Sequence, residues 1–118
     1  FEGGYKIKGR SELEAKRLVE EALAFEQAGA FSILLEGTLS NVASEITRQV
    51  RVPVVGIGSG ADVDGQVLVW SDMLGFFEDF KPKFVKRYLD GATLVRKGVQ
   101  SYANEVKNKI FPSSEFCY

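Results

Sequence analysis

Short apolar segments that alternate with amphipathic helical patterns constrain this fold more than any other feature of the sequence. Residues 31–36 form an almost wholly apolar run that ends in a carboxylate, and residues 52–57 form a second run that is rich in valine. Such runs are typical of strands buried on both faces of a parallel sheet. Apolar residues recur at helical spacing over residues 11–28 and again over residues 39–50. Helix, strand, helix, strand in this order predicts an α/β fold with a parallel sheet.

Residues beside these patterns predict where the helices begin and end. Ser11 followed by Glu14 has the form of a capping box, which predicts that the first helix begins there. Gly29 stands where a left-handed residue would end that helix. For the second helix, either Thr38 or Ser40 is available as the N-cap.

The pattern after Gly60 is less regular. Residues 64–70 are apolar and β-branched enough for a strand, but a short helix suits them equally well. Phe84 and Val85 could supply another short strand. A final helix is expected over residues 94–110, with Leu94, Val95, Val99, Tyr102, Val106 and Ile110 on one side.

The composition is that of one ordinary globular domain with a small-molecule partner. The chain has 118 residues, of which 45% are hydrophobic, and a net charge of -1, so no broad field favours nucleic acid or a membrane surface. Cys117 is the single cysteine, which excludes an internal disulfide and favours a reducing, cytoplasmic location. No apolar stretch is long enough to cross a bilayer. The chain opens on Phe1 rather than methionine, so we expect a fragment.

Glu36 is the sharpest candidate for chemistry. Histidine is absent, so acid–base catalysis would fall to carboxylates, lysine or tyrosine. Glu36 stands at the carboxyl end of a predicted strand, and ligands of barrels and open α/β sheets bind at that edge. Shielding by Leu35 and neighbouring strands could raise its pKa and suit it to act as a general base. The alternative is that Glu36 caps the next helix or pairs with a lysine at the rim.

A glycine-rich loop and three aspartates are weaker candidates. Residues 56–60 alternate glycine with other residues after the second predicted strand, which fits either a loop that binds an anion or a tight turn. The spacing is not the dinucleotide-binding pattern, because Ala61 follows. Asp62, Asp64 and Asp72 carry oxygen ligands of the kind that Mg²⁺ uses, but loop carboxylates more often cap helices or face water.

The chain resembles the C-terminal half of ketopantoate hydroxymethyltransferases along essentially its whole length. The resemblance is carried, in order, by GGYKIKGR, AFEQAGA, ILLEG, VPVVGIGSGADVDGQVLVWSDMLG and KPKFVKRY. It implies one half of a (β/α)₈ barrel of the TIM type, because such barrels need roughly 250 residues. The N-terminal half of the barrel is then expected upstream, outside this chain.

The resemblance also implies an activity and site residues. The family transfers a hydroxymethyl group from methylenetetrahydrofolate to 2-oxoisovalerate with the help of Mg²⁺, in the pathway to pantothenate and coenzyme A. It places the general base on Glu36, and it places Ile57, Val67 and Val69 on the apolar side of the oxoacid pocket. The Mg²⁺ ligands are expected in the missing half, so no metal ligand is assigned here. Many relatives have histidine where this chain has Ser71.

Two other interpretations stay open at this stage. The chain could be an inactive truncated or proteolysed piece that keeps only subunit contacts, or it could belong to another metal-dependent oxoacid barrel, such as a carbon–carbon lyase. The family resemblance further implies a homo-oligomer. A half-barrel would expose the apolar edges of its sheet, so we expect this chain alone to dimerise, to bind its missing half or to aggregate.

Overall fold

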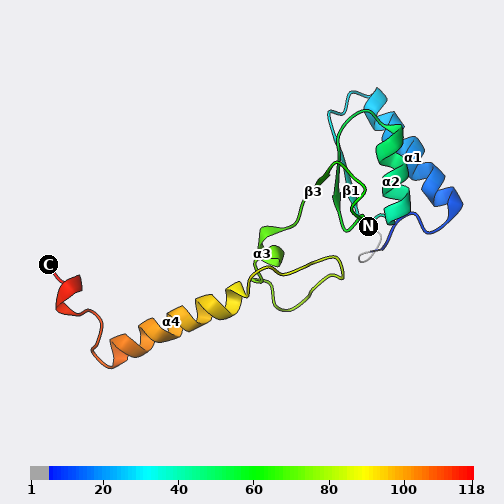
Figure 1. Cartoon of the computed structure of the whole chain (residues 1–118). Coiled ribbons are helices and arrows are strands. Elements are labelled where there is room, and N and C mark those ends of the chain that lie inside the picture. The colour runs from blue at the N-terminus through cyan, green and yellow to red at the C-terminus, as the bar shows by residue number, and fades with distance from the viewer. Residues whose placement is uncertain (1–5) are drawn as a thin grey trace. The chain divides into compact units, whose positions relative to one another are not determined.

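The computed structural model describes residues 6–118, so the GGYKIKGR motif lies partly outside the described residues. The chain divides after Leu68 into two compact units, which we describe one at a time (Figure 1). Over residues 6–118, no helix has both the length and the apolar character needed to span a membrane.

The first unit is a layer pair, in which one layer of helices packs on one parallel sheet. This arrangement confirms the predicted α/β fold class. Its described elements are α1 (Glu12–Gln27), β1 (Ile33–Glu36), α2 (Ser40–Gln49), β2 (Val54–Ile57) and β3 (Gly65–Gln66). The three strands form one sheet in the order β1-β2-β3, and both neighbouring pairs are parallel. The predicted alternation of helix and strand is therefore confirmed, while the barrel itself lies beyond what these residues form.

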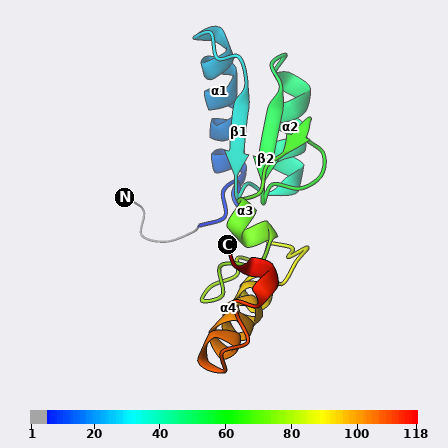
Figure 2. The same ribbon diagram turned by 90° about the vertical axis from the view of Figure 1, so that its left-hand side faces the viewer.

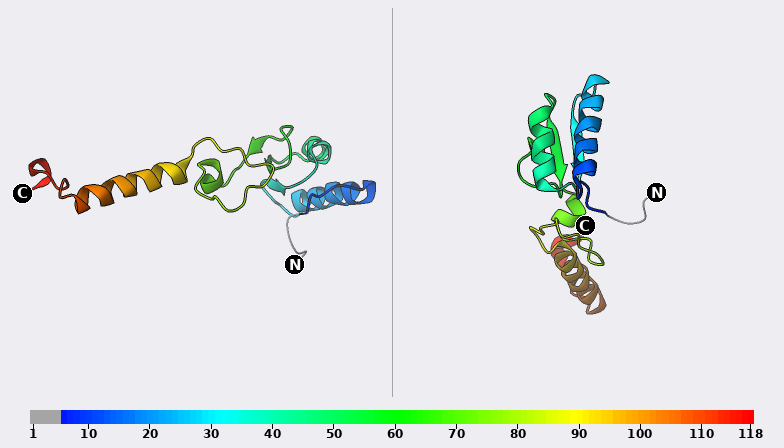
Figure 3. Two further views of the ribbon diagram at one scale, coloured as in Figure 1. Left: turned by 90° about the horizontal axis from the view of Figure 1, so that it is seen from below. Right: turned by 90° about the vertical axis from the view of Figure 1, so that its right-hand side faces the viewer.

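Both helices of this unit cover the same face of the sheet. Figure 2 shows β1 and β2 in front of α1 and α2, and the right-hand panel of Figure 3 shows the same helices in front of the strands. Burial along β1 alternates accordingly: Ile33 and Leu35 are buried against the helices, whereas Leu34 is 62% exposed on the opposite face. The core between the layers is formed by Ala22, Ile33, Leu35, Val42, Ala43, Ile46, Val50 and Val54.

The first helix begins and ends as predicted. Ser11 is its N-cap, and the Ser11 hydroxyl accepts the backbone N–H of Glu14 at 3.2 Å. The Glu14 carboxylate accepts the N–H of Arg10 at 3.0 Å, one residue before the partner of a standard capping box. Gly29 follows the helix with φ +93°, the left-handed conformation that favours glycine.

The predicted side-chain cap of the second helix is wrong. Leu39 is the N-cap of α2, and no side chain bonds to the first turn there. Thr38 lies one residue before this N-cap, where it is buried and its N–H donates to the Ser59 hydroxyl at 3.2 Å. Ser40 is already the first residue of the helix. The residue before the N-cap of α2 is thus bonded to a residue 21 positions away.

Each strand begins two residues later than predicted, at Ile33 and at Val54. Pro53 has no N–H to donate, and its carbonyl accepts the N–H of Ile33 at 2.9 Å. The N–H groups of Arg51 and Val52 donate to the Glu26 carboxylate on α1, at 2.5 and 3.2 Å. Glu26 thus fixes the amino end of β2 to the first helix.

The second unit contains α3 (Trp70–Met73), α4 (Gly91–Lys107) and a 3-10 turn (Ser114–Phe116). Residues 64–70, left open by the sequence, contain both alternatives, because β3 ends at Gln66 and α3 begins at Trp70. The strand predicted at Phe84 and Val85 is wrong: Phe84 lies in a turn, and Val85 is buried with its N–H donating to the carbonyl of Pro82 at 3.0 Å.

Helix α4 begins three residues earlier than predicted and presents an apolar side that this unit leaves uncovered. The N–H of Gly91 donates to the carbonyl of Leu74 at 2.8 Å, which anchors the first turn to the end of α3. The apolar residues predicted to share one side are 44% to 61% exposed. A contiguous apolar surface of this kind is usually buried against another molecule or another part of the protein.

We therefore expect the isolated 118-residue chain to associate rather than to remain a monomer. Both Leu34 on the uncovered sheet face and the apolar side of α4 would leave water on association. Sedimentation velocity at increasing protein concentration measures the state of association. Dimers or larger species should dominate at micromolar concentrations. A monodisperse monomer with a cooperative unfolding transition would contradict the expectation.

Candidate active site

The candidate site lies at the carboxyl ends of β1 and β2. The parallel register pairs Leu34 with Val55 and Glu36 with Ile57. Residues paired across a sheet point to the same face, and alternation puts these pairs on the face that α1 and α2 do not cover. Two residues predicted from the sequence to belong to one site, Glu36 and Ile57, are therefore neighbours at the same strand ends.

The Glu36 carboxylate is exposed and free of competing partners within residues 6–118. Over this range no hydrogen bond or ion pair to it is found, and it does not cap α2, whose N-cap is Leu39. The two alternative roles for Glu36, a helix cap and a rim ion pair, are thus not seen in the described part of the chain. The expected shielding by Leu35 is wrong, because strand alternation directs Leu35 into the helix-covered core.

The backbone after Glu36 turns sharply at Gly37, which has φ +61°. The Gly37 N–H donates to the carbonyl of Ile57 at 2.9 Å, and the Gly37 carbonyl accepts the N–H of Lys8 at 2.9 Å. Non-glycine residues seldom adopt this left-handed conformation. The turn thereby ends β1 directly after the carboxylate and keeps Glu36 at the edge of the sheet.

The glycine-rich loop after β2 closes on this turn. Ser59 lies at its centre, and its hydroxyl is within hydrogen-bonding distance of the carbonyls of Leu35 and Ile57. Gly60 has φ +85°, and a side chain there would meet the Cβ atom of Ser40 at 2.5 Å. The loop therefore packs tightly on the start of α2, which supports the tight-turn interpretation of the glycines. A buried role for Ser59 had no signal in the sequence, since serine usually faces water.

Val67 lies in the same unit as Glu36, and Val69 does not. Val67 follows β3 directly, and its N–H donates to the carbonyl of Gly56 at 3.0 Å, which places it beside the end of β2. Val69 is the N-cap of α3 and the first residue of the second unit. Three of the four predicted site residues are thus gathered in one unit.

The aspartates do not form a metal site within the described residues. The Asp64 carboxylate accepts the N–H of Val54 at 2.8 Å, and the Asp64 N–H donates to the carbonyl of Val54 at 2.9 Å. This reciprocal pair holds the chain beside the start of β2. Asp62 is exposed, and Asp72 belongs to the second unit. Over residues 6–118, no three His, Cys, Asp or Glu side chains are grouped closely enough to hold a metal ion.

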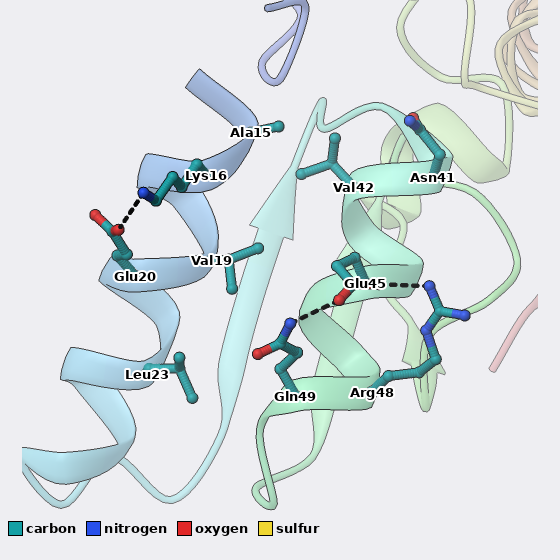
Figure 4. A pocket seen from close by; sticks show the side chains of 10 residues that line it. All are labelled: Ala15, Lys16, Val19, Glu20, Leu23, Asn41, Val42, Glu45, Arg48 and Gln49. Atoms are coloured by element: carbon teal, nitrogen blue, oxygen red, sulfur yellow. Dashed lines mark hydrogen bonds and ion pairs between the residues drawn. The ribbon is translucent and has the colours of Figure 1, made fainter. Parts of the chain in front are cut away.

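A separate groove of about 660 Å³ runs between α1 and α2 on the outer side of the helices (Figure 4). Its apolar floor includes Val19 and Val42, and Glu45 lies on its rim. Hydrogen bonds from the side chains of Gln49 and Arg48, together with the Arg48 charge, lower the pKa of the Glu45 carboxyl. The groove lies on the helix side of the layer pair, whereas Glu36 faces the other side, so it is not part of the candidate site.

These features define a class: a parallel α/β segment that presents an exposed carboxylate at the carboxyl ends of its strands, the edge at which βα folds bind their ligands. The sequence profile of the family described as ketopantoate hydroxymethyltransferase matches residues 1–114. The chain belongs to this family, as its motifs indicated.

Individual relatives agree with the family match. The chain is 95% identical over its whole length to a 3-methyl-2-oxobutanoate hydroxymethyltransferase of Campylobacter concisus, covering 44% of that protein. It is 76% identical to the enzyme of that name from Campylobacter curvus, again over 44% of the relative. Over 45% of the Helicobacter hepaticus relative, the identity is 48%. The chain thus spans less than half the length of the curated relatives it matches.

Proposed function

We propose that a protein of the relatives' length containing these residues transfers a hydroxymethyl group from methylenetetrahydrofolate to 3-methyl-2-oxobutanoate, also called 2-oxoisovalerate. The product is ketopantoate, a precursor of pantothenate and coenzyme A. Family membership over residues 1–114 supports the reaction. The observation that carries the proposal is Glu36, a carboxylate without a competing partner in residues 6–118, held beside Ile57 at the strand ends.

Glu36 acts in this proposal as the general base. Its carboxylate removes the proton from C3 of the oxoacid, which is acidified by the adjacent ketone, and the electron pair is delocalised as an enolate. C3 then attacks the one-carbon unit, and a new carbon–carbon bond forms. Water supplies the hydroxyl group, and the two bonds from the one-carbon unit to the folate nitrogens break. The proton taken from C3 and one proton of the water end on those nitrogens, and tetrahydrofolate leaves. Ile57, Val67 and Val69 would contact the branched apolar end of the substrate.

Other components of the proposal lie outside this segment. Mg²⁺ would be held by residues elsewhere in the protein, since the described residues offer no suitable ligand set. The remaining strands of a TIM-type barrel would cover the exposed face of β1 and β2. We also propose a homo-oligomeric, cytoplasmic enzyme, in line with the family resemblance and the single Cys117. No residue of this segment is assigned to folate.

The decisive test is the folate dependence of turnover. Full-length protein is incubated with Mg²⁺ and 3-methyl-2-oxobutanoate, with and without methylenetetrahydrofolate, and ketopantoate is quantified by mass spectrometry. We expect ketopantoate only with the folate. Cleavage of an oxoacid without folate would instead indicate a carbon–carbon lyase. The 118-residue chain, assayed in parallel, is expected to be inactive, because residues 6–118 offer no group of ligands for Mg²⁺.

A further inference from the structure

Ser59 has an unusual environment for a serine in a loop. It is 1% exposed, and it is one of the largest fully buried side chains in the described part of the chain. Its hydroxyl lies 3.0 Å from the carbonyl oxygen of Leu35 and 3.2 Å from that of Ile57. It also accepts the N–H of Thr38 at 3.2 Å. The single hydroxyl therefore contacts the penultimate residue of β1, the last residue of β2 and the turn that follows β1.

These contacts bracket Glu36. Leu35 directly precedes Glu36, and Thr38 follows it by two residues, so Ser59 bonds to the backbone on both sides of the candidate base. Between Leu35 and Thr38, the N–H of Gly37 donates to the carbonyl of Ile57. The direction in which a side chain leaves a strand is determined by its backbone. Holding the peptide units on either side of Glu36 thus restricts where its carboxylate can point.

Loss of this hydroxyl would release the turn without removing the base. The Thr38 N–H would be left in a buried position without an acceptor, which favours rearrangement of residues 37 and 38. Proton abstraction needs the carboxylate and the C3 proton in near-attack geometry, and a displacement of about 1 Å can cost about a hundredfold in rate. Binding of the oxoacid depends on other contacts, so its KM should change much less.

We propose that Ser59 is a positioning residue, which holds the backbone around Glu36 so that the carboxylate meets the C3 proton of the substrate. This inference rests on the proposed function. The proposed reaction does not require Ser59 to contact the substrate. Its hydroxyl is already engaged with backbone groups.

The test measures deuterium exchange at C3 of 3-methyl-2-oxobutanoate by full-length protein with Mg²⁺, for Ser59→Ala and Ser59→Cys. We expect kcat to fall about tenfold in Ser59→Ala, with KM within about twofold of wild type. Ser59→Cys keeps a donor and an acceptor at this position, although both are weaker and the sulfur is larger than oxygen, so its kcat should lie between those of Ser59→Ala and wild type. If Ser59→Ala does not fold, Ser59→Cys against wild type gives the same comparison.

Glu26→Ala is the matched control for a purely structural effect. Glu26 accepts two backbone N–H groups at the amino end of β2, the end remote from Glu36. Its loss should lower the melting temperature while leaving the kcat of the folded protein unchanged. Equal losses of kcat in Glu26→Ala and Ser59→Ala would overturn the positioning role.

Glu36→Gln, measured in the same series, separates this inference from the proposed function. If Glu36→Gln is inactive while both Ser59 variants exchange like wild type, Glu36 remains the base and the role of Ser59 is wrong. If Glu36→Gln exchanges at the wild-type rate, both assignments are wrong.

Discussion

Full-length protein carrying Glu36→Gln should exchange the C3 proton of 3-methyl-2-oxobutanoate about 10²- to 10⁴-fold more slowly than wild type. Glutamine has nearly the same shape as glutamate but cannot take up a proton at neutral pH. The carboxylate has no hydrogen bond or ion pair within residues 6–118, so the substitution breaks no observed contact and should leave stability unchanged. Proton NMR in deuterium oxide follows the exchange directly, without a need for folate.

A carboxylate elsewhere in the same unit provides the control. Glu45→Gln makes the same chemical change on α2, at the rim of the groove on the helix side of the layer pair. This variant should exchange at the wild-type rate. A Glu36→Gln protein that is as active as Glu45→Gln would exclude Glu36 as the base and leave the family assignment without a catalytic residue in this segment.

Ile46→Ala should cause the largest loss of stability among simple substitutions in the first unit. Ile46 is completely buried between α2 and the sheet, in contact with the core that includes Val54. Removing its side chain loses transfer free energy and leaves a cavity, which together cost about 2–5 kcal/mol. In a protein of the relatives' size, the melting temperature should fall by roughly 5–15 °C.

The matched comparison is Arg48→Ala, two residues further along α2. Arg48 is exposed, and its ion pair with Glu45 lies on the surface, so its loss should change the free energy of unfolding by less than about 1 kcal/mol. Thermal unfolding followed by circular dichroism measures both variants. If both lowered the melting temperature equally, the core position of Ile46 would be wrong.

The order of elements and the parallel sheet could be predicted because they depend on local patterns. Apolar periodicity distinguishes residues 11–28 from residues 31–36 within a few positions, and the carboxylate at the end of the second segment is visible in the sequence itself. The neighbouring positions of Glu36 and Ile57 follow once the strands are parallel and in register. Family motifs such as ILLEG can be recognised from the sequence alone because each is a contiguous stretch of residues.

The apolar pattern missed three details, one of which depends on a contact between distant residues and two on the local course of the backbone. Thr38 is a residue type that often caps helices, but it lies one residue before the N-cap Leu39, and its N–H donates to the buried hydroxyl of Ser59. Leu35 directly precedes Glu36 in the sequence, yet the pleat of the strand directs the two side chains to opposite faces. Val85 is buried as expected of a strand residue, but a turn rather than a neighbouring strand accepts its N–H.

The glycines near the candidate site also determine how this segment can evolve. Any amino-acid change at Gly60 introduces a side chain, and that side chain meets both a left-handed backbone and the body of Ser40. Gly37 has the same handedness but open space around it, so asparagine or aspartate can occupy it at modest cost. Substitutions near the candidate base Glu36 are therefore tolerated better at Gly37, which follows β1, than at Gly60 in the loop after β2.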